Sequence, residues 1–172
     1  MSATSNPGHH DPVTRYVAER DLRGALGTRL LRWLLDHDAD EFSITVMALQ
    51  DTQAPFADAF EDELGPFERP PALRRVPFTD GQRVVERRAR LWTLDAESLQ
   101  RLMSFRGENV FHCEPGPDGW LEDLVIYRRG EIVLALASDH REGVLRLTQD
   151  EHAGVATLGI ASRSCGEWLG TG

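Results

Sequence analysis

The pattern of apolar and polar positions divides the chain into a helix-rich first half and a strand-rich second half. Apolar residues recur at helical spacing from Val13 to Leu34, which predicts an N-terminal helix over residues 12–37, either continuous or bent near Gly24. Residues 41–49 alternate with a period of two and contain several β-branched side chains, so they predict a strand.

Two shorter helices are predicted from apolar residues placed three or four positions apart. Phe56, Phe60 and Leu64 form the apolar stripe of a helix that ends at Gly65, and its carboxylates are expected to face outward. The same kind of spacing predicts a helix over residues 95–105.

The C-terminal part of the chain has the most regular alternation. The predicted strands are residues 108–114, 120–128, 131–138 and 144–148. Because short turn-forming sequences connect them, they are expected to form an antiparallel meander. Thr148 and Glu151 match a capping box and predict a further helix that runs to about Gly159.

The middle of the chain is rich in proline and arginine. Three prolines predict a rigid loop, and residues 65–71 are expected to be a seam between the helical and the β-rich halves. Residues 72–78 and 82–92 predict a β-hairpin. The second of these segments also fits a helical spacing, and we favour the strand.

Together these elements predict an α+β fold. We expect an antiparallel β-meander sheet of about five to seven strands, packed against the N-terminal helix and one or two further helices. At 172 residues the chain is long enough for one domain. Residues 1–11 are expected to be a flexible tail, and residues 12–172 a single α+β domain.

Charge is segregated along the sequence. Between Arg32 and Arg69 lie ten carboxylates and no other arginine, whereas seven arginines occur from Arg69 to Arg90. Two blocks of opposite sign can neutralise each other across the fold or present separate fields to partners. The net charge of -9 disfavours nucleic acid, because neutralisation of phosphate by cations supplies most of that affinity.

The basic residues are all arginine, and the chain has no lysine. This excludes a Schiff-base lysine and a phosphate-binding lysine, because arginine stays protonated and cannot take the first role. The sequence contains no GxSxG, HExxH or paired CxxC motif, and no GxGxxG after a strand. We therefore expect no cofactor and favour a protein that is not an enzyme.

The cellular setting is predicted from cysteine content and hydropathy. Two cysteines are too few for a disulfide scaffold, and the N-terminus lacks the basic and apolar regions of a signal peptide. No apolar run approaches the roughly 20 residues that cross a bilayer. We expect a cytoplasmic protein without membrane contact.

The leading functional hypothesis is an acidic protein-binding module, of the inhibitor or immunity type, that engages a basic partner. Its expected contact residues lie on the outward face of the helix that ends at Gly65: Asp58, Glu61, Asp62 and Glu63. An exposed edge of the meander is also expected to allow pairing with a second copy, which would give a homodimer.

One alternative is a small metal-dependent or Cys/His hydrolase built on the meander. Its candidate ligands or acid-base residues are His112, Glu114, Asp139 and His140. Its candidate nucleophile pairs are Cys113 with His140 and Cys165 with His152.

A second alternative is a nucleic-acid binder that acts through the arginine block at 69–90. Its candidate contacts are Arg83, Arg87, Arg88 and Arg90.

Overall fold

The computed structural model describes residues 13–18, 22, 24–48, 50–77, 84–106, 118–137 and 142–165. Its strands are β1 Thr14–Ala18, β2 Glu41–Met47, β3 Glu68–Pro77, β4 Val84–Thr93, β5 Trp120–Arg128, β6 Glu131–Ala137, β7 Glu142–Leu147 and β8 Ser162–Cys165. Its α-helices are α1 Ala25–Asp36, α2 Ala54–Leu64, α3 Ala96–Arg106 and α4 Gln149–Thr157. Within this part of the chain the strands form one antiparallel sheet in the order β3-β4-β2-β5-β6-β7-β1-β8.

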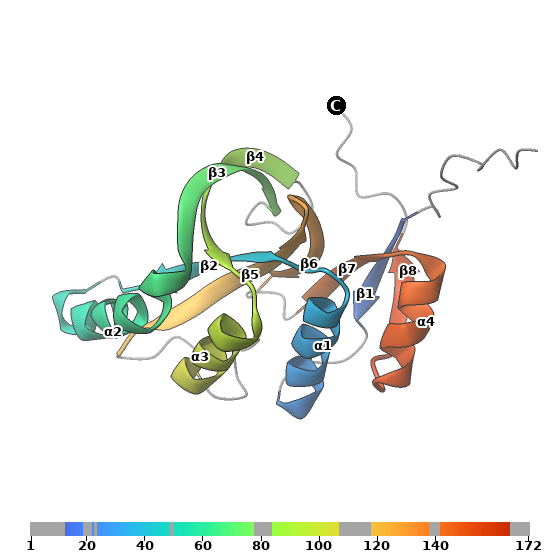
Figure 1. The fold of residues 1–172 in the computed structure, drawn as a ribbon, viewed down its shortest axis with the longest axis horizontal. Coiled ribbons are helices and arrows are strands. Elements are labelled where there is room, and N and C mark those ends of the chain that lie inside the picture. The colour runs from blue at the N-terminus through green and yellow to red at the C-terminus, as the bar shows by residue number, and fades with distance from the viewer. Residues whose placement is uncertain are drawn as a thin grey trace, which may run out of the picture.

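The four helices lie on one face of this sheet, and the β3–β4 hairpin arches over the opposite face (Figure 1). The larger core fills the space between sheet and helices. Trp92 is fully buried there, with its ring centroid 5.6 Å from that of Phe42 and 5.4 Å from that of Phe60. These rings pack β4, β2 and α2 against one another. Large aromatic side chains contribute much of the energy of a packed core.

A smaller second core lies under the arch. Its buried members come from β3, β4, β5 and β6: Val76, Ala89, Leu91, Val125, Tyr127, Ile132 and Ala135. β3 contacts β6 as well as β4, so the hairpin curls over the sheet instead of extending it as a flat edge. The arch therefore has an apolar interior of its own.

An ion-pair cluster at Glu41 ties the arch to the sheet. The Glu41 side chain on β2 is only 5% exposed, and it accepts hydrogen bonds from two arginines of β3. Its carboxylate lies 2.8 Å from Arg69 Nη1, and 2.7 Å and 3.1 Å from Arg74 Nη2 and Nε. A carboxylate that has left water needs such partners, because an unpaired buried charge is strongly destabilising.

The predicted α+β architecture with an antiparallel meander is confirmed, with eight described strands where about five to seven were expected. Helices α2 and α3, strands β5, β6 and β7, and the β3–β4 hairpin all match predicted elements. The capping box is also present: Glu151 N donates to Thr148 Oγ1 at 3.2 Å, and Thr148 N donates to Glu151 Oε2 at 2.8 Å. The predicted tail at 1–11 and the predicted strand at 108–114 lie outside the described residues.

The helix predicted over residues 12–37 is wrong in its first half. Residues Thr14–Ala18 form β1, which pairs with both β7 and β8, and α1 begins only after Gly24. Gly24 adopts φ 63°, a left-handed conformation that interrupts a helix. Two strand partners outweighed the helical spacing of the apolar residues, because pairing and burial override local propensity.

The rigid loop predicted from prolines is also wrong in part. Pro70 and Pro71 lie within β3, an edge strand, and the β3–β4 register shifts between Arg69 and Ala72. Proline is tolerated at an edge or a bulge because the ladder does not require its missing N–H there.

A single domain over residues 12–172 stays a prediction.

The outer edges of the described sheet are β3 and β8. Among the described strands, β5, β6 and β7 of the predicted meander are flanked on both sides, and a homodimer through an exposed edge stays a prediction. Among the described helices, none combines the length and apolarity that a membrane span requires.

The Glu41 cluster predicts a large stability effect for a change of one side chain. Glu41→Gln should lower the free energy of unfolding by about 2 kcal/mol, because the charge-assisted hydrogen bonds to two partly exposed arginines are lost. Urea denaturation measures this. Glu131→Gln is the control: it breaks the Arg146 pair at 2.9 Å, where Glu131 is 62% exposed, and should cost less than about 0.5 kcal/mol. Equal losses in the two variants would show that Glu41 does not hold the arch.

Tyr127 predicts a change of stability at alkaline pH. Burial raises the pKa of its hydroxyl, and the hydrogen bond with Ser43 at 3.2 Å offsets only part of this. Because the folded pKa exceeds the unfolded one, this contribution to stability is complete below about pH 10 and is lost as the pH rises towards the folded value. In a Tyr16→Phe variant, which retains Tyr127 alone of the two tyrosines, phenolate absorbance should develop at higher pH in buffer than in urea. Coincident curves would contradict the prediction.

Candidate functional site

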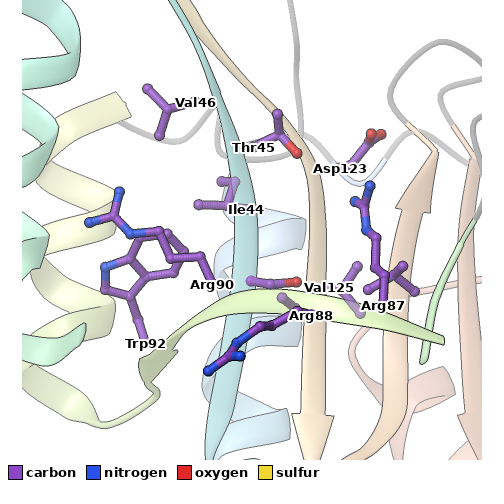
Figure 2. Close-up of a pocket in the computed structure, with 12 residues that line it drawn as sticks. Ile44, Thr45, Val46, Arg87, Arg88, Arg90, Trp92, Asp123 and Val125 are labelled. Atoms are coloured by element: carbon purple, nitrogen blue, oxygen red, sulfur yellow. The ribbon is translucent and has the colours of Figure 1, made fainter. Parts of the chain in front are cut away.

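Strands β2 and β4 pair over a short distance and then separate. Their pairing consists of Glu41 with Thr93 and Phe42 with Trp92. Beyond these pairs β4 leaves the plane of the sheet with the arch, and a cavity of about 340 Å³ lies in the gap (Figure 2). We call this cavity the β2–β4 slot.

The slot is bounded by the edges of two strands. Four consecutive residues of β2, 43–46, and four of β4, 87–90, line it. Successive side chains of a strand point to opposite faces, so a cavity lined by consecutive residues on both strands lies between their edges. The other lining residues are Val76, Trp92, Asp123 and Val125. Backbone as well as side chains therefore faces the cavity.

Three arginines line the slot, and they differ in their partners. Arg90 is bound to two carboxylates: its Nη1 lies 2.5 Å from Glu61 Oε1, and its Nη2 lies 2.5 Å from Glu68 Oε2. These contacts raise the pKa of Arg90, and its hydrogen bond lowers the pKa of Glu68. Arg87 and Arg88 are exposed and form no ion pair with any other described residue. Two guanidinium groups are therefore available to a partner.

A β-bulge directs a carboxylate to the same place. The register of β2 and β5 shifts between Ser43 and Thr45, and Asp123 adopts φ 53° at that point. Bulges commonly redirect side chains next to functional sites. Figure 2 shows Asp123 beside Thr45 at the slot, with Arg87 pointing towards Asp123. The slot is thus lined by guanidinium groups, a hydroxyl and the Asp123 carboxylate.

Trp92 lines the slot where the paired part of β2 and β4 ends. Its side chain is fully buried, and its indole Nε1 has no hydrogen-bond partner in the described structure. The Arg90 guanidinium lies 4.9 Å from the ring centroid, within the range of a cation–π contact. Trp92 therefore belongs both to the lining of the slot and to the core beneath α2.

The four carboxylates predicted to bind a basic partner all lie on α2, at one end of the molecule (Figure 1). Two of them are held internally, because Glu61 contacts Arg90 and Glu63 contacts Arg101 at 2.9 Å. Asp58 and Asp62 are exposed, without an ion pair to the rest of the described chain. The acidic and basic blocks of the sequence therefore neutralise each other in part.

The hydrolase candidates fall mostly outside the described residues. These include His112, Cys113, Glu114, Asp139 and His140, and so does Arg83 of the nucleic-acid set. In the ranges that the structure does cover, no group of three or more His, Cys, Asp or Glu side chains could hold a metal ion.

The structure does not bring Cys165 and His152 together. His152 stacks on Tyr16 with centroids 3.8 Å apart, and its Nε2 lies 2.9 Å from Ser162 Oγ. Tyr16 pairs with Ser164, the residue before Cys165, so Cys165 faces the other side of the sheet. A Cys–His nucleophile pair is therefore not formed at this place.

Sequence reasoning found the arginines but missed the slot. Asp123 falls within the strand predicted over residues 120–128, and the bulge that redirects it leaves no mark in the alternation of side chains. The separation of β2 from β4 depends on residues brought together from distant parts of the chain, and no local pattern reports it.

Comparison with models of known protein families, with curated proteins and with solved structures finds no match. The function is therefore inferred from the geometry of the chain itself.

Proposed function

We propose that the protein is a non-enzymatic binding module and that the β2–β4 slot receives a negatively charged group of its partner. The observation that carries this proposal is the pair of exposed guanidinium groups, Arg87 and Arg88, at a cavity of about 340 Å³. Cavities of roughly this size accommodate ligands in proteins. Guanidinium groups bind carboxylate and phosphate with two parallel hydrogen bonds, so their natural partner is an anion.

The chemistry of the lining favours binding over catalysis. Arginine stays protonated, so Arg87 and Arg88 cannot act as general bases or nucleophiles. Ser43 is already hydrogen-bonded to Tyr127 and is nearly buried, which leaves Thr45 as the more accessible hydroxyl of the slot. Such groups orient and hold an anion.

The distribution of charge favours a partner with few negative charges. The net charge of -9 repels an extended polyanion, and Arg90 is already bound by Glu61 and Glu68. Of the predicted nucleic-acid contacts within the described chain, only Arg87 and Arg88 keep their charge available. Nucleic-acid affinity rises with the number of phosphates neutralised, so this pair supports a local anion site better than a nucleic-acid surface.

The proposal is tested with glutarate, a small dicarboxylate. Glutarate should shift the Nε–Hε NMR resonances of Arg87 and Arg88. The double variant Arg87→Gln/Arg88→Gln should bind glutarate at least about tenfold more weakly, since the loss of one charge-assisted hydrogen bond costs about 1.5 kcal/mol. Arg75→Gln is the matched control, an exposed arginine of the same hairpin that does not line the slot. Neutral glutaramide should not bind. Equal binding by the double variant and the control would refute the proposed site.

A second candidate function is the capture of a basic partner by the outer face of α2. The observation in its favour is that Asp58 and Asp62, one helical turn apart, are exposed and free of ion pairs within the described chain. Complementary surface charge mainly accelerates and steers association. The inhibitor or immunity type of function and the cytoplasmic location stay predictions.

Two sets of substitutions on α2 separate an interface from internal pairing. Asp58→Asn/Asp62→Asn should weaken binding of a lysine-rich peptide by about threefold at low salt, with no loss of melting temperature, because exposed charges add little to stability. Glu61→Gln should instead lower the melting temperature, since Glu61 holds Arg90. Affinity by calorimetry and melting by circular dichroism give the two readouts. Unchanged affinity in the Asp58/Asp62 variant would remove this candidate.

A further inference from the structure

Two strand edges face the slot without a partner among the described strands. β2 pairs with β5 along its far side from Glu41 to Met47, and β4 pairs with β3 along its far side from Val84 to Trp92. On the slot side their mutual pairing stops after Phe42 and Trp92. Within the described residues, the backbone of 43–46 and of 87–90 therefore faces the cavity with no strand to pair with.

Backbone edges of this kind are templates for another chain. An extended peptide that adds to a free edge gains main-chain hydrogen bonds for affinity, and its alternate side chains give specificity. A small anion can use the guanidinium groups but cannot pair with a strand edge. The slot has both features, edges and cations, at one place.

Resting on the proposed function, we propose that the partner of the β2–β4 slot is an extended acidic peptide segment that adds as a strand along the free edge of β2. Its carboxylates then meet Arg87 and Arg88. The pairing is the one that the sheet itself uses elsewhere, and the charge is complementary to the exposed Arg87 and Arg88 of the slot.

The two arginines lie on opposite sides of the slot, and this sets the spacing of the carboxylates. Arg87 shares its side of β4 with Ala89, a member of the core under the arch, and Arg88 shares its side with Trp92, a member of the core beneath the helices. Neighbouring side chains of an added strand also point to opposite sides. Two adjacent acidic residues therefore place one carboxylate near each arginine.

The apolar side chains that line the slot determine which residues should flank the acidic pair of the peptide. On the arch side the slot is lined by Val76 and Val125, and on the helix side by Ile44 and Val46. These apolar walls favour β-branched residues on either side of the acidic pair. The peptide acetyl-Val-Thr-Glu-Glu-Val-Thr-amide has this pattern and serves as the probe.

Calorimetric titration of the full chain with this probe tests the inference. Replacing both glutamates of the probe by glutamine should weaken binding about tenfold, and Arg87→Gln/Arg88→Gln in the protein should remove that difference. Arg75→Gln should behave as the unchanged protein. N-methylation of alternate amides, made in both possible phases, should weaken at least one phase about tenfold, because the methyl group blocks pairing with a strand edge.

Hydrogen exchange gives a second readout. The slot-side amides of residues 43–46 should exchange more slowly when the probe is bound, because pairing protects them. Binding without such protection, or binding by both N-methylated peptides as tight as by the unmethylated probe, overturns strand addition. If glutarate still binds through Arg87 and Arg88 in that case, the proposed function stands and only the peptide mode falls.

The remaining outcomes are also decisive. If neither glutarate nor the probe binds, both the inference and the proposed function fail. If a single-stranded oligonucleotide displaces the probe and binds more tightly, with affinity that falls steeply with salt and depends on Arg87 and Arg88, the nucleic-acid alternative replaces the peptide.

Discussion

The ion-pair cluster of Glu41 with Arg69 and Arg74 is the constraint on which the arrangement of the second core and the slot depends. It fixes β3 above β2 at the base of the arch, where a buried carboxylate is held by two arginines from the same strand. Because the charge cannot return to water without opening this contact, the hairpin is held over the sheet and cannot unroll into a flat extension of it. The slot exists because the β3–β4 hairpin curves away from the plane of the sheet. Both the Glu41 ion pairs and the apolar residues under the arch stabilise this curvature.

Trp92 connects this region to the rest of the fold. Its ring belongs to the core beneath α2, while its backbone makes the last pair between β2 and β4. Arg90, two residues earlier, reaches back to Glu61 on α2 and to Glu68 at the start of β3. The helix that carries the acidic residues and the strand that carries the available arginines are therefore mechanically joined. Carboxylates of the acidic block and an arginine of the basic block form one ion-pair network at this junction. Asp58 and Asp62 on α2, and Arg87 and Arg88 on β4, lie outside this network.

The sequence predicted elements whose pattern is local and failed where tertiary pairing decides. The meander strands, α2, α3 and the Thr148–Glu151 cap follow from alternation, spacing and hydrogen-bonding side chains within a few residues. β1 was missed because its apolar residues also fit a helix, and only β7 and β8 reveal the strand. At the candidate site, the arginine block was visible in composition, but the pairing of Arg90 with Glu61 and the bulge at Asp123 require the folded chain. Charge identity is therefore readable from the sequence, whereas charge availability is not.

The arch lies over the edge of β2 that has no partner among the described strands, and this restricts the kind of molecule that can reach that edge. A free edge on the outside of a sheet can pair with the edge of another sheet, and β3, one of the two outer strands of the described sheet, carries Pro70 and Pro71, which disfavour such pairing. In the proposed binding mode, the partner enters the gap between β2 and β4, so β4 bounds the space beside the edge of β2. Access would then depend on the folding state of the visitor: an unfolded or disordered segment could thread into the gap, while the same sequence within a folded domain could not.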